Sequence, residues 1–533
     1  MAIRLGRIFG DNAVLQRGKK VHIWGFTQKG KKVTLSFAGE NSETTADENG
    51  RFDVFFPAMP KGGPYTIEAA GQDGDKALST GVMIGDVILV SGQSNMEFPM
   101  ERVRETYPDE WNVSDDLIRT FKVTERGVFG RTLPDVETGE WKSLSADTID
   151  LFSAVGYFTA KHLRRKEDVA TALVDISLGG AWIQAFMSEE MLEGFDDALA
   201  EAKKFSDDGY LQKVLYDNEN NAAEWMKELD RKDEGISGHY KDGVQILEKG
   251  RNIVFPDFFS DTELDGYIGT IWIAKKFIVP AEYAQHEATV WFGTIVDFDS
   301  CYVNGQFIGN TEYTYPPRRY KIPEGLLKEG ENTIVLRIGI EKGYGRVTPG
   351  KLYAVVFGEG VRVTDGFNES LEGIDHCIPL CGVWKYLPGV KCAPSPDVVF
   401  TNWKPTALWN GMLGPLAGFP IKAFAFYQGE SNCPENKIYK ALTKSFIEGL
   451  RKCWKDDIPY ICVELPEFNA RMEEISYDGG KAWRGLRQAQ ESCRDIPGFY
   501  LVDAYGTGEL NDLHPQRKEP IGGMIARTIL NLS

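Results

Sequence analysis

Hydrophobic and polar residues alternate in short runs along roughly the first 80 positions of the chain. The clearest runs cover residues 20–24, 32–37, 51–56 and 65–69, and segments rich in Gly, Asn and Asp separate them. Alternation with a period of two is typical of half-buried β-strands, and Gly, Asn and Asp favour turns. The sequence therefore predicts a small N-terminal β-sandwich over residues 1–82.

The pattern changes after residue 82. Continuous apolar runs rich in β-branched residues occur at 87–90 and 172–176. Helical spacing covers 154–165, and a charged helical stretch extends from about 189 to 230. Unbroken apolar runs are typical of strands buried on both faces of a parallel sheet, and their alternation with helices indicates an α/β domain. Residues 83–240 are interpreted as the first part of that domain.

Strand-and-turn patterns return over residues 241–375. Apolar and alternating runs at 270–277, 288–292, 300–303 and 333–339 predict strands, and Asn304-Gly305 is a strong signal for a tight hairpin turn. The α/β pattern then resumes and continues to the end of the chain. Residues 241–375 are therefore predicted to be a β domain inserted into the α/β domain, whose second part is 376–533.

The first buried run ends at a small polar turn that contains Ser94. The turn reads Ser-Gly-Gln-Ser-Asn over residues 91–95. Open α/β sheets place their chemistry at the carboxyl ends of the strands. A hydroxyl at the start of the following helix would lie near free N–H groups that favour a developing oxyanion. The alternative is that Ser94 only caps the helix.

Two other strand ends carry groups that could bind an oxyanion. The run that ends at Tyr427 leads to Asn432, whose side-chain amide has two N–H groups and no charge to titrate. The run that ends near residue 178 leads to Gly179 and Gly180, whose backbone N–H groups could face a reacting carbonyl. Each signal is weak when taken alone, because such turns are common.

His514 is the candidate general base. The chain has six histidines, and His514 combines an acidic neighbour, Asp512, with a loop setting before Pro515. Imidazole is the usual base for activating a serine hydroxyl near neutral pH. Ser431 is a weaker nucleophile candidate, since the adjacent Glu430 would oppose a nearby alkoxide. Neither serine lies in a Gly-x-Ser-x-Gly elbow, which argues against the α/β-hydrolase fold.

Four motifs occur in one order along the chain: Gly-Gln-Ser-Asn-Met at 92–96, Ser-x-Gly-Gly at 177–180, Tyr-Gln-Gly-Glu-Ser-Asn at 427–432 and Asp-x-His-Pro at 512–515. Together they resemble the SGNH hydrolase superfamily and, within it, the sialate O-acetylesterase family of carbohydrate esterases. The resemblance covers roughly residues 5–230 and 375–533. It implies an SGNH-type, flavodoxin-like α/β sandwich with a parallel sheet. The inserted region is similar to the jelly-roll domains of glycoside hydrolases related to β-galactosidase. In this chain it would either bind sugar or act only as a spacer.

The resemblance also implies roles for individual residues. Ser94 would be the nucleophile and His514 the general base. The oxyanion donors would be Asn432, the N–H of Ser94 and one glycine of the 179–180 pair, with Gly180 favoured over Gly179. Three flanking residues would either fix loop geometry or contact the sugar: Gln93, Gln428 and Glu430.

The chain departs from the family pattern near the base and near the pocket. The superfamily usually carries its third triad member three residues before the histidine, where this chain has Asn511. Either Asp512 or a backbone carbonyl would then orient His514. Ala181 and Phe186 replace a small hydroxyl residue and a tryptophan of relatives, which bears on the substrate more than on the reaction.

Composition and charge restrict the classes of molecule that this protein is expected to bind. The 533-residue chain has a formal net charge of −18, which argues against nucleic acid or an anionic membrane as partner. An anionic sugar such as sialic acid would need a local cation, for which Arg487 is a candidate. A surface or helix-pairing arginine is the alternative. No metal-ligand motif or phosphate-binding loop is evident, so neither metal nor cofactor is predicted.

The eight cysteines form no compact disulfide framework, and residues 1–6 lack the apolar core of a signal peptide. These features predict a cytoplasmic protein, or a secreted or periplasmic one if a leader has been removed. The oligomeric state, including a homo-oligomer, stays open. The predicted function is that of a metal-independent serine esterase that removes O-acetyl groups from carbohydrate, with sialate first. Two alternatives remain, namely an acetylxylan or other plant-polysaccharide deacetylase and a non-catalytic carbohydrate-binding protein.

Overall fold

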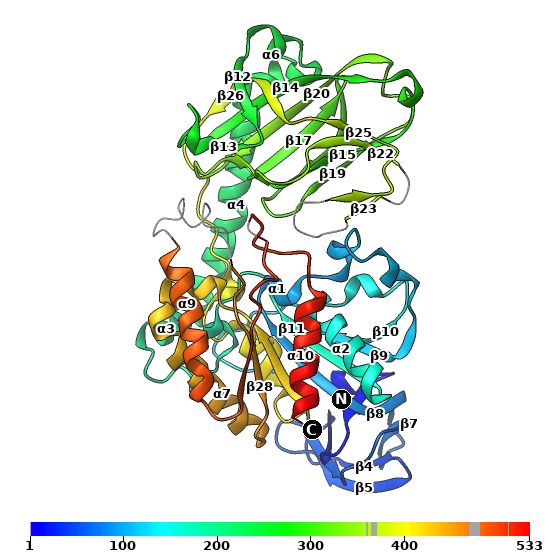
Figure 1. The fold of residues 1–533 in the computed structure, drawn as a ribbon. Coiled ribbons are helices and arrows are strands. Elements are labelled where there is room, and N and C mark those ends of the chain that lie inside the picture. Colours follow the sequence, from blue (N-terminus) through cyan, green and yellow to red (C-terminus); the bar gives the residue numbers. More distant parts are fainter. Residues whose placement is uncertain (1, 359–360, 364–369, 468–479, 510, 533) are drawn as a thin grey trace. The chain divides into compact units, whose positions relative to one another are not determined.

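The structure is a computed structural model that describes residues 2–358, 361–363, 370–467, 480–509 and 511–532. The chain forms two compact units. One consists of Met1–Leu211 with Phe400–Ser533, and the other is Gln212–Val399. Figure 1 shows the α/β elements of the first unit and the strands of the second.

The core of the first unit is a largely parallel sheet. Its strand order is β10-β9-β11-β8-β27-β28-β29. All neighbours in this order are parallel except β10, which is antiparallel to β9. The bounds are β8 Lys76–Gly92, β9 Asp115–Lys122, β10 Trp141–Leu144, β11 Thr171–Ser177, β27 Ala423–Tyr427, β28 Tyr460–Val463 and β29 Phe499–Val502. The predicted α/β class with a parallel-sheet core is confirmed.

Two helix pairs cover this sheet from its two sides (Figure 1). One pair is α2 (Ala154–Glu167) with α10 (Glu519–Asn531), and the other is α7 (Asn436–Trp454) with α9 (Lys481–Ser492). Ser153 caps α2 by accepting the backbone N–H of Gly156. Shorter helices are α1 (Ser94–Glu97) and α3 (Asp196–Phe205).

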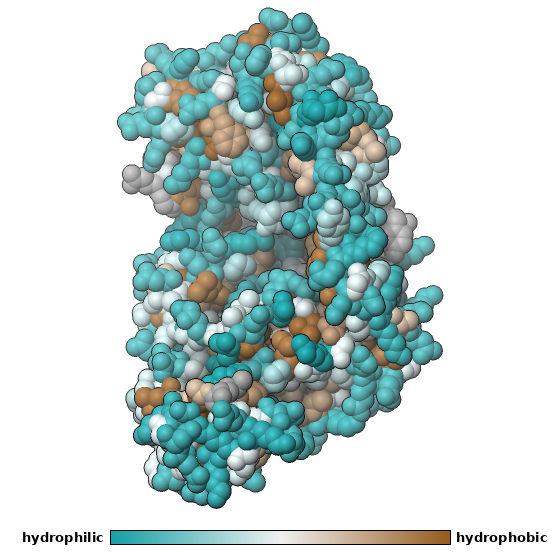
Figure 2. All heavy atoms as spheres, turned by 180° about the vertical axis from the view of Figure 1, so that it is seen from behind, coloured by the Kyte–Doolittle hydropathy of each residue, from teal (hydrophilic) through white to brown (hydrophobic). Residues whose placement is uncertain are grey.

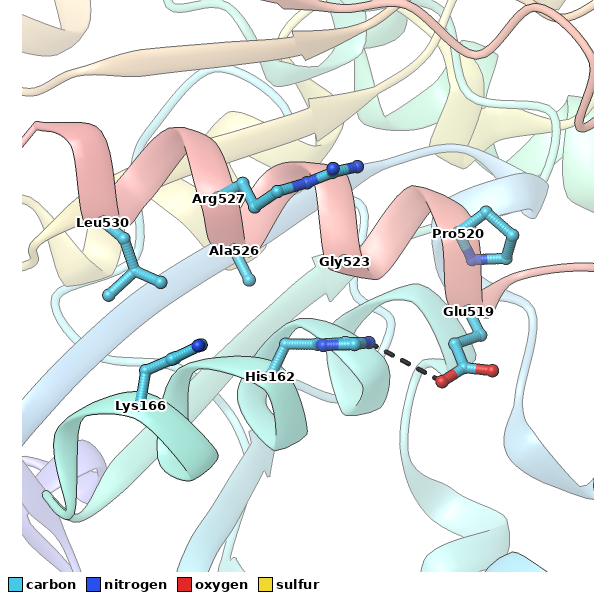
Figure 3. Close-up of a pocket in the computed structure, with 8 residues that line it drawn as sticks. All are labelled: His162, Lys166, Glu519, Pro520, Gly523, Ala526, Arg527 and Leu530. Atoms are coloured by element: carbon cyan, nitrogen blue, oxygen red, sulfur yellow. Dashed lines mark ion pairs between the residues drawn. The ribbon is translucent and has the colours of Figure 1, made fainter.

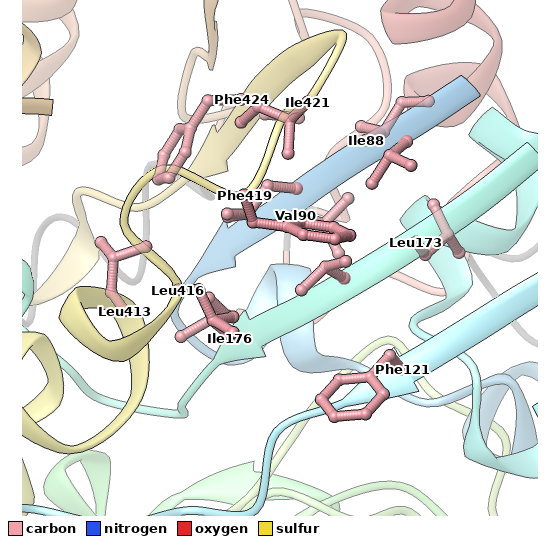
Figure 4. Packing of buried hydrophobic residues seen from close by; sticks show 14 of the residues in the cluster. Ile88, Val90, Phe121, Leu173, Ile176, Leu413, Leu416, Phe419, Ile421 and Phe424 are labelled. Atoms are coloured by element: carbon pink, nitrogen blue, oxygen red, sulfur yellow. The ribbon is translucent and has the colours of Figure 1, made fainter. Parts of the chain in front are cut away.

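Burial on both faces explains the unbroken apolar runs. Every residue of β11 and β27 is buried, as is the segment 87–90 of β8. Figure 4 shows how side chains from these strands pack with the segment that precedes β27. A parallel sheet between two helical layers offers no solvated face, so alternation is not required.

The N-terminal strands join the central sheet through β8. One small antiparallel sheet contains β1 (Arg4–Leu5), β3 (Val21–Phe26) and β6 (Arg51–Phe56). The first half of β8 pairs with β2 (Val14–Gln16) and β7 (Gly62–Gly71), and β7 pairs with β4 (Lys32–Phe37), next to β5 (Glu40–Thr45). The predicted boundary at residue 82 lies inside β8, which is continuous between the two regions.

The second unit consists mainly of antiparallel strands. Its six-stranded sheet has the order β12-β26-β14-β20-β17-β18, and its four-stranded sheet has the order β19-β15-β22-β25. The two sheets share one apolar core. The larger sheet contains β12 Arg251–Phe255, β14 Gly269–Val279, β17 Phe298–Val303, β18 Gln306–Thr311, β20 Gly330–Ile340 and β26 Gly382–Lys391; the smaller contains β15 Ala288–Phe292, β19 Arg318–Ile322, β22 Ala354–Phe357 and β25 His376–Pro379.

The hairpin predicted at Asn304-Gly305 is confirmed. Both residues have positive φ angles, 50° and 82°, and they connect the antiparallel strands β17 and β18. This is the backbone that a two-residue turn of the Asn-Gly type requires.

The second unit is wider than the predicted insertion of 241–375. At its start, α4 (Asp208–Lys232) leads to Asp233, whose buried carboxylate accepts from Thr270, Trp272 and Arg337 on β14 and β20. At its end, β26 lies between β12 and β14. The boundary expected at residue 375 is therefore too early, because β25 and β26 belong to the sheets of this unit.

The surface carries mostly polar side chains. Figure 2 shows one face, on which hydrophilic residues predominate and apolar residues are scattered. Among the described residues, no helix combines the length and apolar composition needed to cross a bilayer.

Candidate active site

Ser94 is placed by a sharp turn at the carboxyl end of β8. Gly92 has a φ of 130°, and a Cβ atom there would overlap the carbonyl group of Tyr427 on β27. The next residue, Gln93, donates its backbone N–H to that carbonyl at 3.0 Å. Only glycine allows this close approach, so Ser94 becomes the first residue of α1.

The structure brings Ser94 and His514 together from positions 420 residues apart. Ser94 Oγ lies 2.7 Å from His514 Nε2. The imidazole is 4% exposed and stacks beside the ring of Phe98, with centroids 6.0 Å apart. The pair lies within hydrogen-bond reach for transfer of the hydroxyl proton to the ring.

Burial lowers the pKa of His514 to about 4, while the carboxylate of Asp512 acts in the opposite direction. The imidazole is therefore neutral at pH 7 and can accept a proton. Asp512 Oδ1 also accepts the backbone N–H of His514 at 2.9 Å, so this carboxylate shapes the loop that carries the base.

Asn432 is fully buried and its amide orientation is determined by its neighbours. Its Oδ1 accepts from the backbone N–H of Ile183 at 3.0 Å and from Gln428 Nε2 at 2.6 Å. Its Nδ2 donates to Gln184 Oε1 at 2.9 Å. Because a backbone N–H can only donate, the atom facing Ile183 must be the oxygen. The amide nitrogen carries a second N–H that could serve an oxyanion.

The two glycines after β11 differ. The N–H of Gly179 donates to Glu97 Oε2 at 2.6 Å, so it is not available to an acyl group in this arrangement. Gly180 has a φ of 74°, and no described residue accepts its N–H. A Cβ atom on Gly179 would lie 3.6 Å from Ser94 Cβ, which places this loop beside the nucleophile. Of the two predicted donors, the geometry retains Gly180.

Gln93 and Gln428 make hydrogen bonds within the protein. Both are buried. Gln93 Oε1 accepts the backbone N–H of Ser431 at 3.2 Å, and Gln428 Nε2 donates to Asn432. These contacts fit the interpretation that the two residues fix loop geometry, and contact with the sugar stays a prediction. Glu430 accepts from Asn95 Nδ2 at 2.7 Å, and burial raises the pKa of its carboxyl.

Arg487 lies on α9 and is already paired. Its Nε lies 3.3 Å from Glu464 Oε1, at the end of β28, and its guanidinium lies 5.7 Å from the ring of Tyr505. These contacts fit the alternative of a surface or helix-pairing arginine. Binding of a sugar carboxylate by Arg487 stays a prediction.

The competing nucleophile Ser431 has a different task, since its Oγ donates to the carbonyl of Gly180 at 2.8 Å. Ala181 and Phe186, the two departures from the family pattern near the pocket, are both buried. Phe186 packs against Phe426 with ring centroids 5.7 Å apart, and the Ala181 carbonyl accepts from Gln428 Nε2 at 3.2 Å.

Sequence reasoning missed several residues next to these groups. Asn95 belongs to the same motif as Ser94 and Glu97 directly follows that motif, so their closeness to Ser94 in the sequence is a signal that could have found them. Lys518 follows His514 by four residues on a loop. Trp403, whose ring packs directly on Gly180, has no signal in the local sequence because the contact joins distant segments.

Among the described residues, no group of three or more His, Cys, Asp or Glu side chains could hold a metal ion. A separate hollow of about 420 Å³ lies between α2 and α10 (Figure 3). It is lined by His162, Lys166 and Glu519, among others, and contains none of the predicted site residues.

A serine–imidazole pair at the carboxyl edge of a parallel sheet is an arrangement suited to nucleophilic catalysis of acyl transfer, the class of reaction that includes ester hydrolysis. Residues 390–531 match the family described as carbohydrate esterase, sialic acid-specific acetylesterase. This match confirms the resemblance inferred from the motifs, and over these residues the chain is similar to the sialate O-acetylesterases among the carbohydrate esterases.

One of three similar solved structures agrees at the level of the fold. A carbohydrate acetylesterase from Xanthomonas citri is 19% identical, with a TM-score of 0.56, over 99% of this chain and 75% of that one. A β-glucuronidase from Ruminococcus gnavus is 22% identical over 29% of this chain and 25% of its own, with a TM-score of 0.19. A protein from Arabidopsis thaliana is 10% identical over 84% of this chain and 98% of its own, with a TM-score of 0.31.

Proposed function

We propose that this protein is a carbohydrate esterase that removes O-acetyl groups from sugars, with acetylated sialic acid as the first candidate substrate. The observation that carries the proposal is the 2.7 Å contact between Ser94 Oγ and His514 Nε2. Ser94 attacks the acetyl carbonyl while His514 takes the hydroxyl proton. His514 then returns this proton to the sugar oxygen as the sugar leaves. Water attacks the acetyl-enzyme with the same base, releasing acetate and restoring Ser94.

Three N–H groups are proposed to stabilise the tetrahedral oxyanion. The N–H of Ser94 opens α1 and has no carbonyl one turn earlier to bond with. Gly180 supplies a second backbone N–H, and Asn432 supplies its remaining amide hydrogen. Donors fixed in advance need no reorganisation when charge develops on the carbonyl oxygen.

Asp512 is proposed to stabilise the imidazolium that forms during attack. Burial of His514 disfavours this cation, and the nearby carboxylate offsets part of that cost. Asp512 thus takes the role of the acid that relatives carry one residue earlier.

Activity should persist to a lower pH than an ordinary histidine would allow. Protonated His514 cannot accept a proton, so kcat/KM is lost as pH falls through its pKa. That pKa is about 4, compared with the ordinary 6.5. We therefore expect the acid limb of kcat/KM for p-nitrophenyl acetate to lie well below 6.5.

The control for acid unfolding is to incubate the enzyme at each pH, return it to neutral buffer and measure the activity that it recovers. A limb centred on the ordinary histidine value, with full recovery after this treatment, would contradict the proposed electrostatics.

Substrate choice is tested by comparing two acetylated sugars. We expect a higher kcat/KM for O-acetylated sialic acid than for acetylated xylo-oligosaccharides. Arg487→Gln is expected to reduce the first activity and to spare the second, because only sialic acid carries a carboxylate. Hydrolysis of the xylo-oligosaccharides alone would retain the esterase chemistry and favour the plant-polysaccharide alternative.

The finer description of the β regions belongs to the same proposal. An N-terminal β-sandwich is supported by the three-stranded sheet β1-β3-β6 and by the strands β2, β4, β5 and β7, which extend the central sheet beside the first half of β8. A jelly roll in the inserted region is supported by two antiparallel sheets around one core. A sugar-binding role for residues 241–375 stays a prediction.

A further inference from the structure

A buried hydrogen-bond network lies directly behind the nucleophile, and its central residue is Asn95. The Nδ2 atom of Asn95 donates to the carbonyl of Leu513 at 3.0 Å and to Glu430 Oε1 at 2.7 Å. Its Oδ1 accepts from Lys518 Nζ at 2.6 Å. Asn95 is 1% exposed and Lys518 is fully buried. One amide therefore joins three segments that are distant in the sequence.

The chemistry of the partners determines the orientation of this amide. A backbone carbonyl can only accept, so the atom facing Leu513 is the nitrogen. A lysine ammonium can only donate, so the atom facing Lys518 is the oxygen. Both amide hydrogens and the oxygen of Asn95 are used, which leaves the side chain one orientation.

Asn95 and two of its partners, Leu513 and Glu430, lie within two residues of groups of the proposed reaction. Asn95 itself follows Ser94, and Leu513 precedes His514. Glu430 lies two residues before Asn432, on the loop that carries the proposed oxyanion donor. The bond from Asn95 Nδ2 to the Leu513 carbonyl therefore links the turn of the nucleophile directly to the loop of the base.

Lys518 supports the same arrangement from the other side. Its Nζ lies 4.8 Å from the ring centroid of Phe98, the ring that stacks beside His514. Burial lowers the pKa of Lys518 to about 7, while Glu430, Asp512 and Glu509 favour its charged form and Arg102 opposes it. A buried ammonium is costly unless hydrogen bonds and opposite charges compensate it. Asn95 and the nearby carboxylates supply that compensation.

We propose that Asn95 is a positioning residue for ester hydrolysis, and that with Lys518 and Glu430 it holds Ser94 and His514 at hydrogen-bond distance. The inference rests on the proposed function, since it assigns a task within that reaction. Asn95 touches no reacting atom and acts through the two loops it joins. A displacement of about 1 Å between reacting groups can cost about 10²-fold in rate.

The test is Asn95→Asp, which keeps an oxygen for Lys518 but removes both N–H donors. We expect kcat for p-nitrophenyl acetate, counted per active site, to fall about 10²-fold with little change in KM. Active sites are counted by labelling Ser94 with a fluorophosphonate, and the labelling rate should fall in parallel. The matched control is Asn410→Asp, because Asn410 is also buried and hydrogen-bonded, to Thr132 and Val128. We expect this control to retain wild-type kcat per labelled site.

A second pair of variants covers the case in which Asn95→Asp does not fold. Glu430→Gln keeps an acceptor for Asn95, whereas Glu430→Leu removes it. We expect the glutamine variant to retain most of the kcat per active site that the leucine variant loses. Equal kcat values for the two would overturn the proposal, as would wild-type kcat per labelled site in folded Asn95→Asp.

The pH profile gives a readout that a purely structural role would not move. The charge of Lys518 lowers the pKa of His514, so Lys518→Met should raise that pKa and move the acid limb of kcat/KM to higher pH. An unmoved limb in folded Lys518→Met would count against the network. These outcomes can be distinguished from failure of the proposed function itself. In that case wild-type protein would neither hydrolyse the ester nor be labelled at Ser94.

Discussion

Replacement of Ser94 by alanine is expected to abolish turnover of p-nitrophenyl acetate, with a loss in kcat of about 10⁶-fold, the order found when a hydrolytic serine is removed. Its Oγ lies 2.7 Å from His514 Nε2 and is the proposed nucleophile, so the variant has no group to form the acetyl-enzyme. Single-turnover measurements should show no acetyl-enzyme in the variant. Because Ser94 is only half-buried, the change should leave the fold unaltered.

Ser431→Ala is the matched control for this experiment. Ser431 also follows a strand and a glycine, but its hydroxyl bonds to the Gly180 carbonyl rather than to the base. We expect this variant to be labelled by a fluorophosphonate as wild type is, whereas Ser94→Ala is not. Labelling that survives in Ser94→Ala would remove Ser94 as the nucleophile. A wild-type protein that is never labelled would favour the carbohydrate-binding alternative.

The second large effect is expected for Asn432→Ala, with a fall in kcat of about 10²–10³-fold, typical for loss of one oxyanion donor. KM should change less, since the donor acts most strongly once the carbonyl oxygen is charged. The change also removes the acceptor of the Ile183 N–H and one hydrogen-bond partner from each of the amides of Gln184 and Gln428. We therefore expect a lower melting temperature, with a cost of about 1–3 kcal/mol for buried groups left unsatisfied.

Gln184→Ala separates the two effects of that variant. It removes the acceptor of one Asn432 hydrogen but leaves the amide itself in place. Its melting temperature should fall, while kcat should fall much less than in Asn432→Ala when both are measured well below unfolding. Equal losses of kcat in the two variants would mean that Asn432 acts on loop structure rather than on the oxyanion.

Much of the α/β unit followed from local pattern. The runs at 87–90, 172–176 and before Tyr427 are unbroken because their strands are buried on both faces, so period and composition identified them. The positions of Ser94, Asn432 and His514 were indicated by residue type at strand ends and by the order of motifs. Short segments contain this information because strand formation and turn formation depend on neighbouring residues.

Other features depended on contacts between distant segments. The end of the inserted unit was placed at residue 375, yet β26 pairs with β12 and β14, which precede it by more than 100 residues. The sequence favours Gly180 over Gly179 only through the family resemblance, whereas in the structure the carboxylate of Glu97 occupies the N–H of Gly179. Neither the pairing of β26 nor the contact of Glu97 with Gly179 can be recognised from the periodicity or composition of the neighbouring sequence.

The sequence by itself determined which residue types are available for ester hydrolysis and which strands carry them. The tertiary structure decided how they meet, including the 2.7 Å approach of Ser94 to His514, the fixed amide of Asn432 and the network around Asn95. The physical reason is that strands and turns are set by interactions within a few residues, whereas these contacts join loops hundreds of residues apart. Their geometry exists only once the sheet has assembled and brought the strand ends to one edge.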